Sequence, residues 1–370
     1  MRRLLQLDIF QWFAMLIGLT SYRLVDNRFI QTRIARTYAM IVNVFTVTML
    51  PLPLSRLAYS VSLCFWLPRF MWITPYVLYA VNYAVILEDQ QLEELIPTRA
   101  PLTPGALKEV QPLLTKLLRE EKRNGKQRLK RSLLLPFYLK FFTAAFMCLT
   151  ICVFQFHSGA ELTWKTTAQI IFLSNVLNIL EVVPMGYFLA LWHIARGFDF
   201  VNQRLDDIMA STPIDLKELR NLWSLHAAMT RTVLRINKIY GVQMLAFRFD
   251  NFIFGVINAY WGTFFSFHAD TNVLWVVFGA VSYWIRCVDS YLIDHVSDLA
   301  MHYQSSPKHA WTEKYWSKEI NSYVTYVSSC KLQLRTCGLY QENRSLWFET
   351  ISSILYYYIM LLQFHLVIRN

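Results

Sequence analysis

Five side chains near the carboxyl end of the chain are predicted to lie on one helix face or next to it. Tyr357, Met360 or Leu361, and Phe364 recur every three or four residues, with the amide of Gln363 beside them. Around a symmetry axis, such a face would form an apolar constriction that closes by dewetting and a ring of amides that coordinates a partly dehydrated cation. The alternative is that this face packs within its own bundle and Gln363 bonds a neighbouring helix. Spacing alone favours packing.

Charged residues inside apolar stretches form a second group of candidates, because a charge in hydrocarbon is costly and is generally paired or functional. They are Glu181, Arg248, Asp250, Arg286 and Asp289. Each Arg has an Asp two or three residues away, which favours structural pairing. Glu181 stands apart from the others because a helix-kinking proline, Pro184, follows it.

Aromatic and amide side chains in the outer halves of the apolar stretches suit a binding site for a small molecule, which should be concave and sparsely polar. They are Trp72, Tyr76, Tyr79, Gln155, Gln169, Asn175, Asn178, Tyr260, Trp261 and Trp275. Asn175 and Asn178 are three residues apart and share a helix face, which suits recognition of hydroxyls or carbonyls. The alternative for the Trp and Tyr residues is an aromatic belt at the membrane surface.

An amphipathic helix is predicted ahead of the fifth long apolar stretch. Its repeating positions are Leu222, His226, Met229, Val233, Ile236 and Tyr240. His226 could sense pH, but a packed or hydrogen-bonded histidine fits this face better. The run REEKRNGKQRLKR (residues 119–131) favours a solvated basic face near anionic lipid over a specific lipid site.

Common catalytic and metal-binding motifs are missing from the sequence. It contains no Gly-rich phosphate loop, no His-Glu-x-x-His, no paired Cys-x-x-Cys and no evident nucleophile elbow. We therefore expect no enzymatic activity, no cofactor and no metal site.

Composition places these candidate residues in a membrane. Of the 370 residues, 55% are hydrophobic and 16% aromatic, which is more than a soluble domain needs. Seven runs are long enough to span about 30 Å of hydrocarbon. We place them at residues 37–55, 68–88, 133–156, 167–195, 239–267, 272–292 and 346–368. A shorter run at 9–20 is expected to be re-entrant or interfacial, and retained rather than cleaved.

Lys and Arg residues set the expected orientation, because cytosolic loops carry the excess of positive charge. Most of them fall in the amino-terminal segment 1–36, in the loops 89–132 and 196–238, and in the segment 293–345. The opposite side keeps only Arg56, Arg69, Lys165 and Arg369. We therefore predict a cytosolic amino terminus and an extracellular carboxyl terminus. This distribution accounts for most of the formal net charge of +11 without a nucleic-acid partner.

Two short motifs resemble those of insect gustatory receptors. The last helix of that family carries Thr-Tyr, five apolar residues and Gln-Phe, and residues 356–364 here are YYYIMLLQF, with Tyr at the threonine position. The stretch LRNLWSLHAAMTRTVLRINKIYGVQML resembles a second family motif through His226, Asn237 and the pair Tyr240-Gly241. Chain length, number of spans and inverted orientation also agree, so the resemblance covers the whole chain.

The resemblance implies an all-α membrane protein with seven transmembrane helices and helical extensions into the cytosol. It implies a taste receptor that acts as a ligand-gated, non-selective cation channel, assembled as a homo- or hetero-tetramer with related receptors. The last helix and short extracellular tail (346–370) would then line the pore, and the cytosolic segment 293–345 would anchor the subunits to one another. Residues 37–292 would form helices one to six, and residues 1–36 a cytosolic segment containing the short apolar helix.

The ligand implied by the resemblance is a small-molecule tastant. Sugar and carbon-dioxide receptors form recognisable subgroups that this sequence does not match, so a bitter or otherwise aversive compound is the default expectation. The expected location is the plasma membrane of gustatory neurons, in dendrites and axons. An alternative from a different class is a membrane receptor or transporter that does not conduct and signals through its cytosolic loops.

Overall fold

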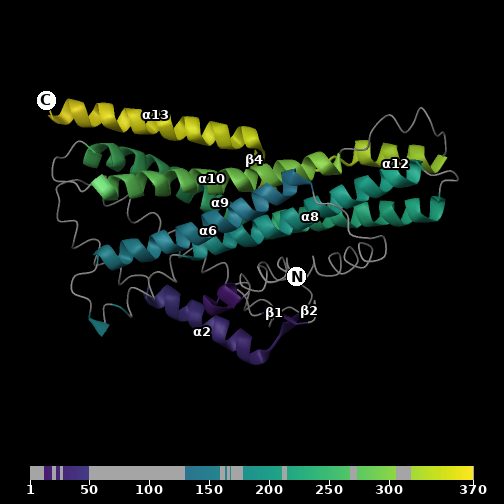
Figure 1. Cartoon of the computed structure of the whole chain (residues 1–370), viewed down its shortest axis with the longest axis horizontal. Coiled ribbons are helices and arrows are strands. Elements are labelled where there is room, and N and C mark those ends of the chain that lie inside the picture. The colour runs from purple at the N-terminus through teal and green to yellow at the C-terminus, as the bar shows by residue number, and fades with distance from the viewer. Residues whose placement is uncertain are drawn as a thin grey trace.

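The chain folds as a bundle of long helices that run along one common axis (Figure 1). The computed structural model describes residues 12–18, 22–25, 28–49, 130–158, 163–164, 167, 178–210, 215–266, 273–305 and 318–369. The helices are α2 (Arg33–Met49), α6 (Arg131–Ser158), α8 (Ile179–Ala210), α9 (Leu216–Ser266), α10 (Val273–Gln304), α12 (Lys318–Ser329) and α13 (Arg344–Arg369). Two antiparallel hairpins pair β1 (Tyr22–Val25) with β2 (Arg28–Gln31), and β3 (Arg335–Thr336) with β4 (Tyr340–Gln341).

Most of the predicted spans fall on these helices. The runs 133–156 and 346–368 match α6 and α13, and the run 272–292 forms the first part of α10. Within the described residues, Arg131–Thr150, Val273–Gln304 and Arg344–Val367 are long and apolar enough to cross a membrane. The predicted span at 68–88 lies outside the described residues.

Helix α9 joins the predicted amphipathic helix and the fifth span into one continuous helix of 51 residues. Its first turn is capped by Asp215, whose Oδ1 accepts hydrogen bonds from the backbone N–H groups of Lys217 (2.9 Å) and Glu218 (3.1 Å). The predicted stripe Leu222, His226, Met229, Val233, Ile236 and Tyr240 is buried along its whole length. The amphipathic prediction is therefore confirmed.

Helix α8 lies at the centre of the bundle and contacts α6, α9 and α10. Nearly every side chain between Glu181 and Ala195 is buried, as expected for a helix covered on all sides. The buried Trp192 fixes α8 to the start of α6, because its Nε1 donates a 2.7 Å hydrogen bond to the backbone oxygen of Leu133.

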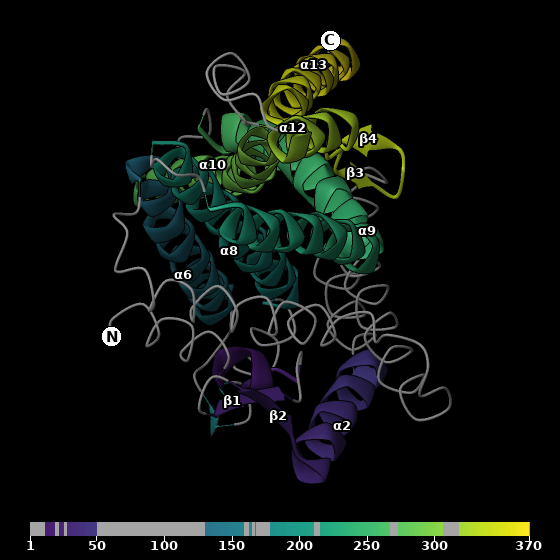
Figure 2. The same cartoon turned by 90° about the vertical axis from the view of Figure 1, so that its right-hand side faces the viewer.

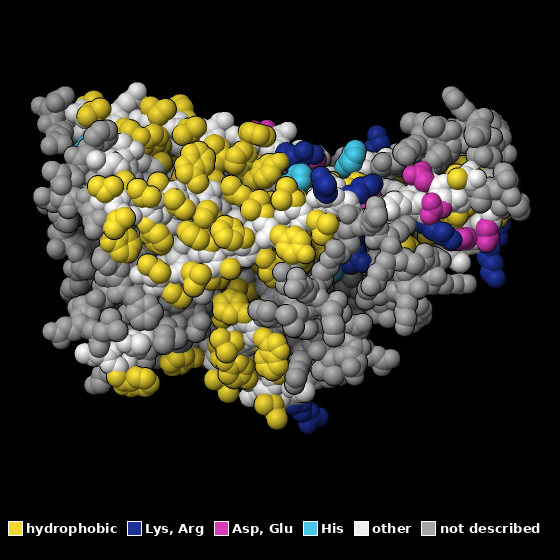
Figure 3. Space-filling model, viewed as in Figure 1, with side chains coloured by type: hydrophobic (Ala, Val, Ile, Leu, Met, Phe, Trp, Pro, Cys, Tyr) yellow, Lys and Arg dark blue, Asp and Glu magenta, His cyan; other side chains and the backbone are white. Residues whose placement is uncertain are grey.

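Polarity divides the molecule along its length. On the face shown in Figure 3, hydrophobic side chains cover the part that carries the outer portions of α13 and α10, whereas charged and histidine side chains gather toward α12. This division places the hydrophobic part in the membrane and the α12 part outside it. Helix α13 lies at the edge of the bundle, on the opposite side from α2 (Figures 1 and 2).

Candidate functional site

Helix α13 is attached to the bundle through one side, which packs on α9 along its length and on α10 near its first residues. Ile354 is 3% exposed and lies against Gly255, where an added Cβ would come within 2.7 Å of Ile354 Cδ1. One turn further along α13, the hydroxyl of Tyr358 lies 2.8 Å from the hydroxyl of Thr263. These contacts define the covered side of α13.

The covered side continues to the far end of the helix. Nδ1 of His365 lies 2.9 Å from the hydroxyl of Tyr260 on α9. Leu361 is half-buried and, at a spacing of three residues from Tyr358 and four from His365, falls on the same stripe. Of the predicted pore residues, Leu361 is therefore the one that lies on the side facing α9.

The opposite side of α13 is uncovered by the described residues of the chain. The exposed side chains there include Tyr356, Tyr357, Ile359, Met360, Gln363, Phe364, Leu366 and Val367. Gln363 is nine residues from Ile354, which is about 180° around a helix that turns about 100° per residue. Tyr357 lies nearer the edge of this side, where its ring meets Phe252 of α9 edge to face with centroids 5.6 Å apart. The structure thus places four of the five predicted pore residues on the uncovered side.

The described ligand candidates lie at different places in the bundle. Asn178 is buried at the start of α8, where its backbone oxygen accepts the N–H groups of Glu181 and Val182. Tyr260 contacts α13, as described above, and Trp275 meets Phe278 of its own helix edge to face. The remaining candidates lie outside the described side chains: Trp72, Tyr76, Tyr79, Gln155, Gln169, Asn175 and Trp261.

The charges inside the bundle pair between helices. Arg248 of α9 donates through Nη1 to Asp294 of α10 at 2.7 Å and through Nη2 to the second carboxylate oxygen. Arg286 of α10 pairs with Asp250 of α9 and donates from Nε to the side-chain oxygen of Asn251 at 2.9 Å. Helix α10 is thus bound to α9 by two ion pairs of opposite polarity.

A third ion pair binds α10 to α6. Asp289 accepts hydrogen bonds from Nζ of Lys140 and from the hydroxyl of Thr143, both at 2.5 Å, and all three side chains are buried. Glu181 of α8 is also buried and lies close enough to Arg286 and Lys140 to interact with their charges. A lysine in an apolar run was visible in the sequence, but Lys140 was not among the predicted charged candidates.

Every one of the predicted membrane charges except Glu181 is therefore paired, although the partners are not the neighbours in sequence. Arg248 and Asp250 are two residues apart, a spacing at which helix side chains do not meet, and each binds a side chain of α10 instead. Asp289 is three residues from Arg286 but is bound by Lys140. Asp294, which pairs with Arg248, lies just beyond the predicted end of its span and was missed for that reason.

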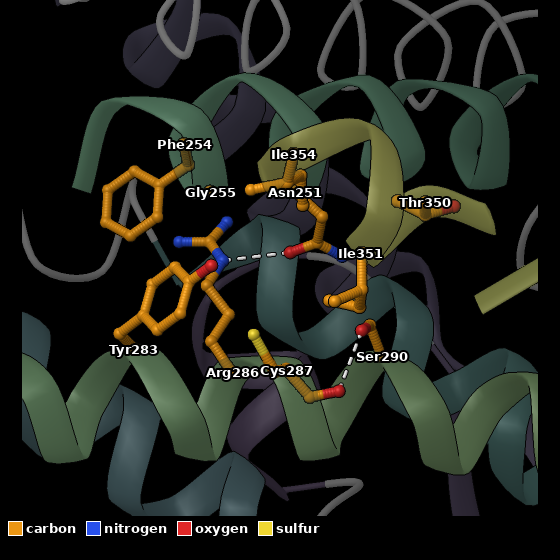
Figure 4. A pocket seen from close by; sticks show the side chains of 10 residues that line it. All are labelled: Asn251, Phe254, Gly255, Tyr283, Arg286, Cys287, Ser290, Thr350, Ile351 and Ile354. Carbon is orange, nitrogen blue, oxygen red and sulfur yellow. Dashed lines mark hydrogen bonds between the residues drawn. The ribbon is translucent and has the colours of Figure 1, made fainter. Parts of the chain in front are cut away.

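A small pocket lies between α9, α10 and the covered side of α13 (Figure 4). It is lined by Asn251, Phe254, Gly255, Tyr283, Arg286, Cys287, Ser290, Thr350, Ile351 and Ile354. The guanidinium of Arg286 lies 4.0 Å from the centre of the Phe254 ring. Nδ2 of Asn251 is buried and has no hydrogen-bond partner among the described residues. The cavity volume is about 20 Å³, which suits about one water molecule rather than a tastant.

Comparison with known proteins identifies the family. The family model for the 7tm chemosensory receptors matches residues 7–368. The chain belongs to this family. One relative is gustatory receptor 59b of Drosophila erecta, which is 46% identical to this chain over 302 residues. The matched residues cover 80% of this chain and 50% of that protein. The chain thus spans about half the length of that relative, which is an insect gustatory receptor by name.

Solved structures of an insect olfactory receptor show the same fold. OR5 of Machilis hrabei matches with a TM-score of 0.62 at 13% identity, and its complex with eugenol with 0.59 at 12%. Each match covers 96% of this chain and 97% of the other. The chain is therefore an all-α membrane receptor of the chemosensory fold, and the expectation that it is not an enzyme is confirmed by its family.

Proposed function

We propose that this chemosensory receptor is a gustatory receptor that acts as a ligand-gated, non-selective cation channel, with a pore lined by the uncovered side of α13. The main observation in support of this proposal is that the described residues of the chain cover very little of α13. In the most apolar stretch of α13 only 6% of the residues are buried, compared with 39% in α6 and 17% in α10.

Lipid alone does not account for the uncovered side. Gln363 points directly away from α9, in the outer part of the apolar run 346–368, and an amide facing hydrocarbon without a partner costs free energy. A neighbouring subunit or a water-filled pore removes that cost. Copies of α13 around one axis would bring Gln363 and Phe364 of each subunit together, which would form a ring of amides next to an apolar constriction.

The family resemblance supplies the rest of the proposal. It favours a homo- or hetero-tetramer with related gustatory receptors, in the plasma membrane of gustatory neuron dendrites and axons. A bitter or otherwise aversive small molecule would open the pore. Eugenol is the ligand of the OR5 complex, and that likeness supports a small organic ligand without identifying it.

Expression of the chain alone, in cells that lack related receptors, tests this function. We expect tastants to evoke currents whose reversal potential fits a channel that admits several cations. We also expect the receptor to have the mass of a tetramer after purification in mild detergent. A ligand-responsive receptor that carries no current, either alone or with related receptors, would instead favour the non-conducting receptor or transporter.

A further inference from the structure

A buried carboxylate, Glu342, lies between β4 and the first residue of α13. Its side chain is fully buried, although the surrounding sequence is a polar turn. It is not one of the charges that form the ion pairs described above. We propose that the observed position of α13 is that of the closed pore, and that Glu342 is a positioning residue that holds the inner end of the helix there. Loss of its hydroxyl partners would then favour the open pore; this inference rests on the channel function proposed above.

The carboxylate of Glu342 collects hydroxyl donors from three separate elements. Tyr187 of α8 donates to Oε2 at 2.7 Å, and Thr336 of β3 donates to Oε1. Ser297 of α10 lies 3.1 Å from Oε2 and shares its single hydroxyl hydrogen between Glu342 and the backbone oxygen of Ile293. Glu342 therefore ties α8, α10 and the β3–β4 hairpin to one point.

Burial makes these hydroxyl donors necessary. An ionised carboxylate removed from water is destabilised unless hydrogen bonds or a cation replace its hydration. The guanidinium of Arg248 lies close enough to interact with Glu342, but its bidentate bond goes to Asp294. Hydroxyl donors are therefore the direct partners that stabilise the charge of Glu342, and each of them contributes to fixing its position.

Glu342 is joined to α13 by a short and well-ordered connection. Only Asn343 separates it from the first residue of the helix, and the side-chain oxygen of Asn343 caps the helix by accepting the N–H of Leu346 at 2.9 Å. The backbone N–H of Glu342 itself donates to the oxygen of Leu334 at 2.9 Å. A shift of the inner end of α13 must therefore move Glu342 relative to Tyr187 and Ser297 and break its hydrogen bonds.

The test compares Tyr187→Phe and Thr336→Val with a matched control, Tyr303→Phe. Tyr303 is also a buried tyrosine, and its hydroxyl lies 2.9 Å from the hydroxyl of Ser132, away from Glu342. The control therefore removes one buried tyrosine hydroxyl without touching the carboxylate. Glu342→Gln is the fourth variant. If Glu342→Gln fails to reach the cell surface, Tyr187→Phe and Thr336→Val still provide the test.

Two readouts are measured on the full chain. The first is current without ligand, divided by the amount of receptor at the cell surface. The second is amide hydrogen exchange of residues 334–346 in purified protein, which does not depend on conduction. Tyr187→Phe and Thr336→Val should raise the basal current by about tenfold, because a hydrogen bond to a charged group shifts an equilibrium by at least about that factor. They should also speed exchange in 334–346, while Tyr303→Phe does neither.

Each outcome decides between the alternatives. If wild type conducts and the Glu342 partner variants keep its basal current, the role in closing the pore is refuted, whatever happens to exchange. If neither wild type nor any variant conducts, either alone or with related receptors, the channel function fails, and exchange alone then decides whether Glu342 positions α13. Unchanged exchange in Tyr187→Phe and Thr336→Val would in that case refute the positioning role as well.

Discussion

Ile354 of α13 packs directly onto Gly255 of α9, at a point where any larger side chain on α9 would meet it. A Cβ at Gly255 would lie 2.7 Å from Cδ1 and 3.3 Å from Cγ1 of Ile354. This close approach fixes the rotation of α13 about its own axis. It thereby determines that Gln363 points away from α9.

Gly255→Ala should destabilise the receptor by about 1–3 kcal/mol, the usual cost of overpacking a buried contact. The expected measurement is a lower melting temperature of the full chain in detergent. Gly262→Ala is the matched control on the same helix, because nothing among the described residues lies within 4 Å of its added Cβ. Adding Ile354→Val to Gly255→Ala removes the clashing methyl and should restore stability. Equal melting temperatures for the two alanine variants would refute the close contact.

The ion pair between Lys140 and Asp289 should be needed as a pair. Lys140→Met leaves the buried carboxylate of Asp289 without its cation, and breaking a buried ion pair costs about 3–5 kcal/mol. We expect a large loss of folded receptor at the cell surface. Asp289→Leu combined with Lys140→Met should recover much of that loss, since no charge then remains buried at this pair. A double variant that behaves worse than Lys140→Met alone would contradict this account.

His226 should make the receptor less stable in mild acid. Its ring is buried beside Phe198 and Tyr323, and Nε2 lies 3.2 Å from the backbone oxygen of Gln304. Burial lowers the pKa of His226 from 6.5 to about 4. In the unfolded chain the His226 ring is therefore protonated below about pH 6.5. In the folded protein it is protonated only below about pH 4.

The free energy of unfolding should consequently fall as the pH drops from about 6.5 to about 4, by roughly 3 kcal/mol for this group. Melting of the full chain in detergent at a series of pH values measures the effect. His226→Gln removes the titrating ring, so its melting temperature should fall less steeply over the same range. Parallel curves for wild type and His226→Gln would show that His226 does not carry the dependence.

Apolar length and local periodicity were enough to predict the membrane parts of α6, α10 and α13 and one of the buried faces. The stripe from Leu222 to Tyr240 repeats every three or four residues, and this spacing by itself decides which side is buried. The spacing of Tyr357, Met360, Gln363 and Phe364 likewise put them on one side of α13, but whether that side was covered depended on where α9 packs. The sequence could not provide that information, because the contact between Gly255 and Ile354 joins residues far apart in the chain.

Long-range partners were the other part that the sequence could not predict. Arg248 has an Asp two residues away, yet its partner is Asp294 on the next helix. Glu342 follows a short strand in a polar turn, and nothing nearby in sequence indicates that Tyr187, about 150 residues earlier in the chain, donates to it. Such pairs depend on how helices cross, which local spacing does not determine.

Orientation can be checked with cysteines that the chain already has. Cys330 and Cys337 are exposed, free, and lie in the segment predicted to be cytosolic. In a Cys64→Ser background, a membrane-impermeant maleimide should leave intact cells unlabelled and label the receptor after permeabilisation. Replacing Cys330 and Cys337 by Ser should then abolish the labelling. Labelling of these two residues on intact cells would reverse the predicted orientation.

The conductance of single channels with a charge at Gln363 tests the central claim most directly. If the uncovered side of α13 lines a cation pore, Gln363→Lys should lower the conductance by cation repulsion, and Gln363→Glu should maintain or raise it. Asn221→Lys and Asn221→Asp, at an exposed position near the start of α9 and outside the predicted membrane spans, should leave it unchanged. Well-expressed Gln363→Lys and Gln363→Glu receptors with wild-type conductance and selectivity would contradict the claim that this side of α13 lines the pore.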